Sequence, residues 1–130
     1  MEVILNIGLD GVPADLSYTN GKLNPLDARR AMQAVQAVRS HGFDILSAKV
    51  VQSDTEPTLV VRAEDAGIGQ DNRIDMLSTA LKQDCIGVWY PAEQYGQLIG
   101  PRADAWGEFN PEFFIMLDGT RLSHPGLQAA

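Results

Sequence analysis

The sequence is poor in residues that build covalent crosslinks and metal sites. It has one cysteine, Cys85, and two histidines, His41 and His124, among 130 residues. One cysteine cannot form an internal disulfide, which is typical of proteins in a reducing compartment. No apolar run approaches the roughly 18 residues of a membrane-spanning helix, and the N-terminal stretch lacks the basic region of a secretory signal. We therefore expect a cytoplasmic protein that does not contact membranes.

Positive charge is also scarce. Ten Lys and Arg residues stand against 17 Asp and Glu residues, which gives a formal net charge of −7 at pH 7. This balance repels phosphate backbones and anionic membranes, so we expect no direct binding to nucleic acid. It leaves open a protein that occupies the basic, nucleic-acid-binding groove of another protein.

Motifs that would indicate an active site are missing. The stretch DAGIGQD (65–71) lacks the third glycine of a dinucleotide-binding loop. Asp65, Asp71 and Asp75 do not follow the calcium-loop pattern, and neither histidine has a second ligand at metal-binding spacing. Cys85 is expected at a junction between a helix and an apolar strand, where free cysteines are usually buried and unreactive. We therefore expect no catalytic residue, no metal and no cofactor.

Apolar periodicity predicts two helices. The first is expected over 25–41, because Asn24 is a suitable N-cap, Pro25 has a preset helical φ, and Gly42 suits the position after the helix. The second is expected over 73–84, where large apolar side chains recur at helical spacing. Each helix has one apolar side, which predicts that both cover a sheet.

Strands are predicted where β-rich runs are bounded by turn residues. The ranges are 2–9, 43–51, 58–64, 86–90 and 95–100, with a last β-rich run over 113–117. The second and third ranges are expected to pair as an antiparallel hairpin. The order β-α-β-β-α-β predicts one α+β domain over residues 1–130. Its expected form is a ferredoxin-like βαββαβ sandwich, with two helices on one face of an antiparallel sheet and extra C-terminal strands.

Aromatic side chains are few, but they are concentrated near the C-terminus. Seven of the nine lie between Trp89 and Phe114. One interpretation is a satellite core in which the rings hold a long loop on the sheet. The other is a contact surface, because Trp, Tyr and Arg are favoured interface anchors. The residues expected to bind a partner are Tyr95, Arg102, Trp106, Glu108 and Phe109.

The stretch IGPRADAWGEFNPEFFIMLDG, residues 99–119, resembles the C-terminal part of uncharacterised small proteins of bacterial phages, plasmids and integrated elements. The resemblance transfers no functional residue to this chain. It implies an accessory protein of a mobile element, of a kind that often works by binding a host or competing protein.

Three functions follow as hypotheses. The leading one is a non-enzymatic acidic binding protein that acts through protein–protein contacts, as a mobile-element accessory or anti-defence protein. The alternative is a small-molecule-binding or catalytic domain with a pocket between the sheet and the 91–112 loop. The side chains expected to line that pocket are Trp89, Tyr95 and Trp106, with Asp104 or Glu108 as polar groups. The third hypothesis is a homodimer that pairs through a sheet edge or face.

Overall fold

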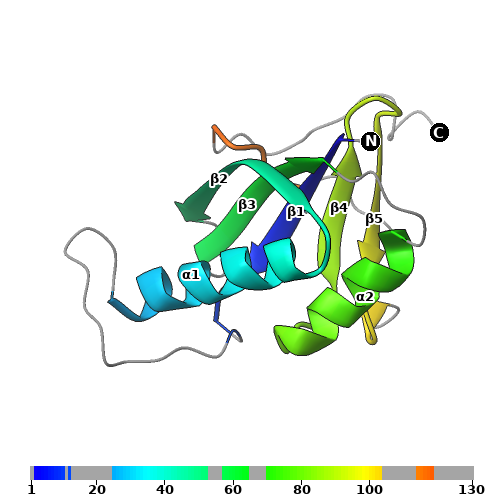
Figure 1. The fold of residues 1–130 in the computed structure, drawn as a ribbon. Helices are drawn as coiled ribbons and strands as arrows, with labels where there is room; N and C mark the ends of the chain where they lie inside the picture. The colour runs from blue at the N-terminus through cyan, green and yellow to red at the C-terminus, as the bar shows by residue number, and fades with distance from the viewer. Residues whose placement is uncertain are drawn as a thin grey trace.

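The computed structural model describes residues 2–10, 12, 25–52, 57–64, 70–103 and 114–118. These residues form five strands and two helices (Figure 1). The elements are β1 (Glu2–Gly8), α1 (Pro25–Ser40), β2 (Asp44–Gln52), β3 (Pro57–Glu64), α2 (Gln70–Ala80), β4 (Ile86–Tyr90) and β5 (Tyr95–Ile99). Neither described helix combines the length and the hydropathy that crossing a membrane requires.

The five strands form one antiparallel sheet in the order β2-β3-β1-β4-β5. β2 pairs with β3, as the sequence predicted, and β5 pairs with β4 through a short turn. The helices make longer connections: α1 joins β1 to β2 with β3 between them, and α2 joins β3 to β4 with β1 between them. The expected α+β class, with an antiparallel sheet and two helices, is confirmed.

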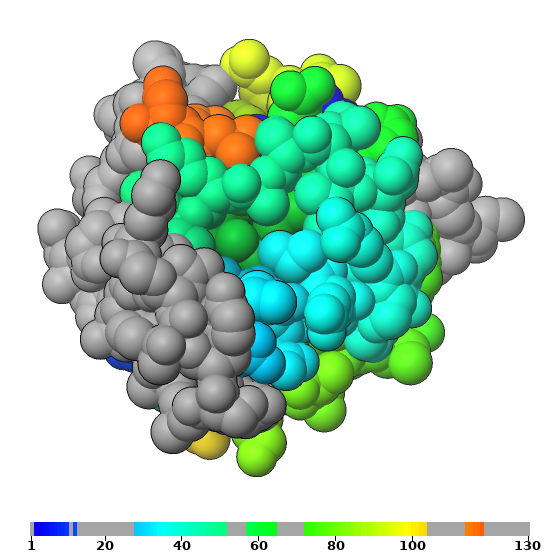
Figure 2. Space-filling model, turned by 60° about the vertical axis from the view of Figure 1, so that its left-hand side comes forward, coloured from blue at the N-terminus to red at the C-terminus, as the bar shows by residue number. Residues whose placement is uncertain are grey.

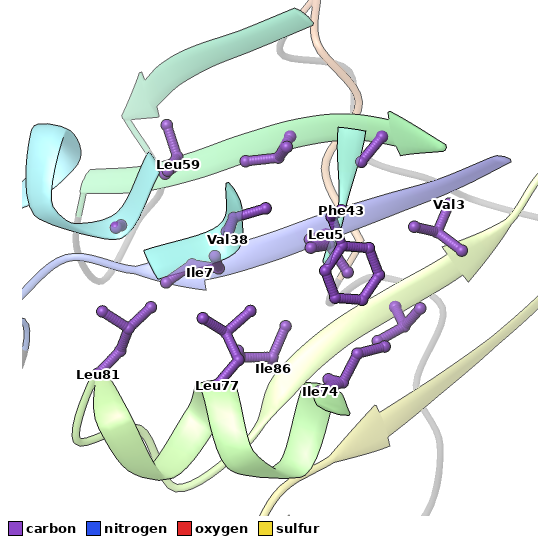
Figure 3. Close-up of a cluster of buried hydrophobic side chains, with 14 of the residues drawn as sticks. Val3, Leu5, Ile7, Val38, Phe43, Leu59, Ile74, Leu77, Leu81 and Ile86 are labelled. Carbon is purple, nitrogen blue, oxygen red and sulfur yellow. The ribbon is translucent and has the colours of Figure 1, made fainter. Parts of the chain in front are cut away.

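Both helices lie on the same face of the sheet (Figure 1), and the main core fills the space between them and the strands. Alternate residues of β1, namely Val3, Leu5 and Ile7, point toward the helices because side chains alternate along a strand. Figure 3 shows them facing apolar side chains from both helices. The residues labelled there are Val38 of α1, Ile74 and Leu77 of α2, and Leu81, which directly follows α2. The apolar stripe predicted for the second helix is therefore confirmed.

Arg73 of α2 fixes the end of α1. Gly42 follows α1 with a φ of 91°, a left-handed conformation that glycine adopts without steric cost. The Arg73 guanidinium donates hydrogen bonds of 3.3 Å to the carbonyls of His41 and Gly42. It also lies over the Phe43 ring, 5.1 Å from its centroid. A cation at the C-terminal end of a helix is favoured by the helix dipole, so this contact stabilises α1 and joins the two helices.

Candidate functional site

The two described members of the predicted binding set lie far apart. Tyr95 begins β5, and Arg102 lies in the turn that follows β5. A five-residue strand separates its first and last Cα atoms by about 13 Å, so these two exposed side chains lie toward opposite ends of the sheet. The other predicted residues, Trp106, Glu108 and Phe109, lie outside the described residues. The structure thus places Tyr95 and Arg102 on separate parts of the surface.

Tyr95 is an exposed aromatic side chain with a fixed orientation. It is 47% exposed, and it lies directly opposite Tyr90 in the ladder between β4 and β5. The two rings are stacked, with centroids 6.1 Å apart and planes at 18°. Tyr90 is buried, and its hydroxyl accepts a hydrogen bond of 2.9 Å from Gln97 Nε2. Because the exposed ring is already ordered, binding at Tyr95 would cost little conformational entropy.

The same end of the sheet is acidic. Glu2 of β1 and Asp44 of β2 both lie directly opposite Glu64 of β3, so three carboxylates stand side by side on the face away from the helices. Arg62 donates a hydrogen bond of 2.8 Å to Glu2 and offsets part of this charge. The turn between β4 and β5 lies at this end too, because Trp89 near the end of β4 pairs with Ile4 near the start of β1, and this turn carries the exposed Glu93. Like charges at opposite positions destabilise a sheet, so the row is unfavourable for the isolated fold.

We call the region formed by Glu2, Asp44, Glu64 and Glu93 the acidic end of the sheet. Tyr95 belongs to the same end, because its partner Tyr90 follows Trp89, which pairs with Ile4 near the start of β1. Tyr95 projects toward the helix face, whereas the carboxylate row projects to the opposite face. A partner that touches both must therefore approach the end of the sheet rather than either face.

The predicted small-molecule pocket does not form from Trp89 and Tyr95. Trp89 lies opposite Gly96 and is buried on the face away from the helices, while Tyr95 projects toward the helix face. Successive residues of a strand point to opposite faces, so these two rings cannot line one cavity. The remaining predicted lining residues, Asp104, Trp106 and Glu108, lie outside the described residues.

The face away from the helices is crossed by residues 114–118, which we call the crossing segment. Phe114 is fully buried and packs over Gly87 of β4 and Gly96 of β5. Its ring lies 5.8 Å from the ring of Trp89, at 49°. At its other end the segment packs near β2, where Val51 belongs to the same apolar cluster. Figure 2 shows the segment, in orange, against β2 at the surface.

Asn6 holds Ile115, the second residue of the crossing segment. Its Oδ1 accepts a hydrogen bond of 2.6 Å from the Ile115 N–H, and its Nδ2 donates one of 3.0 Å to the Ile115 carbonyl. Asn6 is 8% exposed and lies at the centre of the sheet, where an unpaired amide would be costly. Asn6 was not among the predicted site residues, although a polar side chain inside the apolar run EVILNIGL, residues 2–9, is a detectable signal.

The predicted strand over 113–117 is therefore wrong for the residues that the structure describes. Among 114–118, only Ile115 makes a bridge of the kind found in sheets. The segment runs across the strands, from Gly96 of β5 past Asn6 of β1 toward Val51 of β2. Besides that bridge, the main chain of Ile115 pairs with the side-chain amide of Asn6.

Adding a methyl group at Gly96 is expected to destabilise the fold more than adding one at Gly87. A Cβ at position 96 would lie 2.7 Å from Cζ of Phe114 and 2.9 Å from Cε3 of Trp89, both on rigid rings. At position 87 the nearest atom, on Phe114, is 3.4 Å away. Urea unfolding should show Gly96→Ala less stable by about 1–3 kcal/mol and Gly87→Ala within about 1 kcal/mol of the wild type. Equal losses would contradict the packing of Phe114 described above.

Cys85 does not have the character of a nucleophile. Burial, and secondarily the negative charge of Asp84, raise the pKa of its thiol from 9.0 to about 11. We expect iodoacetamide at pH 8 to alkylate Cys85 about 100-fold more slowly in the folded protein than in urea, because only the thiolate reacts. Equal rates in the folded and unfolded protein would show that the thiol is neither shielded nor shifted.

The described residues contain no group of three or more His, Cys, Asp or Glu side chains placed to hold a metal ion. Comparisons of the chain with protein-family models, with curated proteins and with solved structures found no match. Within the described part of the chain, we base the proposed function on Tyr95 and the acidic end of the sheet.

Proposed function

We propose that this chain is a non-enzymatic binding protein whose acidic end contacts a basic surface of another protein. The observation that carries the proposal is Tyr95, which is half exposed yet held in place by its stack on Tyr90. Ordered tyrosines are frequent anchors of protein interfaces. The carboxylates at the acidic end and the net charge of −7 would attract a basic partner and repel an acidic one.

The small-molecule alternative receives no such support, because Trp89 and Tyr95 project from opposite faces. We keep the hypothesis of a cytoplasmic accessory or anti-defence protein of a bacterial mobile element, which rests on the resemblance of residues 99–119. For the fold, we propose a ferredoxin-like core of β1, α1, β2, β3, α2 and β4, with β5 added at one edge. In support, β1 lies between β3 and β4, and both helices lie on one face.

The function is tested with the full chain as an affinity bait in bacterial lysate at low salt. We expect a protein with a basic surface to be retained and to be released as the salt concentration rises. Tyr95→Ala should weaken binding of that protein about tenfold or more, as removal of an interface anchor does. Arg102→Ala is the matched control, because it changes an exposed residue at the other end of the sheet and should leave binding unchanged. Equal retention by both variants would contradict the proposed surface.

Removing one carboxylate from the row should stabilise the fold. Asp44→Asn eliminates the repulsion between Asp44 and the opposite Glu64, so we expect the free energy of unfolding to rise by about 0.5 kcal/mol in low salt. Asp75→Asn, which removes the same charge from α2, is the control. If Asp44→Asn raises the free energy of unfolding no more than Asp75→Asn does, the carboxylates of Glu2, Glu64 and Asp44 do not repel one another measurably.

A further inference from the structure

Two exposed apolar side chains lie at the two outer strands of the sheet. Among the residues that the structure describes, four large apolar side chains are exposed, namely Met32, Leu46, Met76 and Tyr95. The two methionines lie on the helices, whereas Leu46 lies on β2 and Tyr95 on β5. β2 and β5 are the outer strands (Figure 1), so they lie about 19 Å apart at the usual strand spacing.

Leu46 and Tyr95 also lie at the same level of the sheet. The register, continued by one residue beyond the pair of Ile4 and Trp89, places one row of residues across the five strands, namely Ile45, Ala63, Val3, Tyr90 and Tyr95. Leu46 directly follows the first residue of this row. The carboxylate row of the acidic end is the next row toward the end of the sheet. A surface that spans Leu46 and Tyr95 along this end therefore also meets the carboxylates.

A β-bulge places Leu46 outside the ladder between β2 and β3. The consecutive β3 residues Arg62 and Ala63 pair with Ser47 and Ile45. Leu46 is therefore an extra residue without a partner on β3. A bulge disrupts the ladder locally and can re-aim a side chain. Without residue 46 the same pairs would follow one another without interruption, so the register of the sheet does not require Leu46.

We propose that Leu46 is a second anchor of the interface, and that the partner is a protein with a basic surface and an apolar site on each side of it. This inference rests on the proposed function, in which Tyr95 and the carboxylates bind a basic protein. The carboxylate row meets the basic centre of that surface, and the two apolar side chains enter sites about 19 Å apart. Charge alone suits many cationic proteins, whereas two apolar contacts at a fixed spacing restrict the choice.

The test compares Leu46→Ala with the wild type by isothermal titration calorimetry. The probe is the basic protein that the wild-type chain retains from lysate, after purification. We expect the dissociation constant to rise about fivefold or more, because the variant loses most of the apolar area that the leucine buries in the complex. Met32→Ala truncates an almost equally exposed side chain of α1 and should leave the dissociation constant unchanged. Poly-lysine, which offers charge without apolar sites, should bind all three proteins equally.

Deletion of Leu46 separates binding from folding. It should weaken binding as Leu46→Ala does, and its urea midpoint should be no lower than that of Leu46→Ala, because the ladder then continues without a bulge. A large loss of stability in both variants would show that Leu46 serves the fold, and would overturn the inference. Equal affinity of Leu46→Ala and the wild type, with Tyr95→Ala still weaker, would overturn the inference alone. If the wild-type chain retains no basic protein, the proposed function fails as well.

Discussion

Phe114→Ala is expected to lower the free energy of unfolding by about 3–5 kcal/mol. The ring is fully buried against Gly87, Gly96 and Trp89. Because two of these neighbours are glycines, they have no side chains that could move into the space that the ring leaves. The loss in the free energy of unfolding should therefore be among the larger losses seen when a buried apolar side chain is truncated. It is measured from urea unfolding of the variant and the wild type.

The control for this prediction is Met116→Ala, which truncates a partly buried side chain of the same segment. We expect it to cost about 1 kcal/mol or less, because much of the side chain is already in contact with water. A loss below about 1 kcal/mol for Phe114→Ala would mean that the segment does not contribute to the stability of the sheet.

Asn6→Asp is expected to lower the free energy of unfolding by about 2–3 kcal/mol at pH 7. The substitution keeps the size of the side chain and the acceptor for the Ile115 N–H. It replaces the Nδ2 donor by a carboxylate oxygen, which then faces the Ile115 carbonyl oxygen at a distance set by the present 3.0 Å hydrogen bond. Burial of the charge adds to this repulsion.

The loss caused by Asn6→Asp should depend on pH. Burial and the facing carbonyl would raise the pKa of the introduced carboxyl in the folded state above about 3.9, its value in an unfolded chain. Below the unfolded pKa both states are protonated, and the protonated carboxyl can donate to the Ile115 carbonyl. The loss therefore starts near pH 4, grows as the pH rises through the folded pKa, and is complete above it. It is measured as the difference from the wild type at each pH.

Asn6→Leu serves as the control for the pH dependence. It cannot titrate, and it leaves the Ile115 N–H and C=O without their partner, so its deficit should be the same at pH 4 and pH 7. A deficit for Asn6→Asp that is equally independent of pH would contradict the hydrogen bond from Asn6 to the Ile115 carbonyl.

Most of the helices and strands could be predicted because their signals are local. Asn24, Pro25 and Gly42 bound the first helix in sequence, and the structure ends that helix at Ser40. The second helix ends at Ala80 rather than at 84, because Lys82 adopts a left-handed φ of 56°. Lysine does not favour that conformation, so the residue type at position 82 gave no signal that the helix ends there.

The crossing segment could not be predicted from local signals. A β-rich run such as 113–117 can form a paired strand within a sheet or a segment that packs across the face of a sheet. Both arrangements bury apolar side chains, so the run alone does not distinguish them. The distinction depends on Asn6, which lies 109 residues away and supplies the hydrogen bonds that a neighbouring strand would otherwise supply. Contacts of this kind are visible only once the sheet is assembled.

The candidate binding residues were predicted from their residue types, which are frequent at interfaces. The sequence did not indicate where these residues lie relative to one another in the fold. Tyr95, predicted to bind a partner, lies at the start of β5 and is exposed. The length of β5 separates Tyr95 from Arg102. The register of β4 and β5, in which Tyr90 pairs with Tyr95 and Trp89 with Gly96, places Tyr95 and Trp89 on opposite faces. That register decides which face each ring occupies, and it depends on a turn whose conformation includes a left-handed Gln94.

Hydrogen–deuterium exchange of the complex with the captured basic protein tests the proposed function most directly. The chain is compared free and bound, and protection is mapped to peptides along the sequence. We expect new protection at the acidic end, in peptides that contain Glu2, Asp44, Glu64 and the turn from Tyr90 to Tyr95. Protection confined to the outer surfaces of α1 and α2, with the acidic end unchanged, would contradict it.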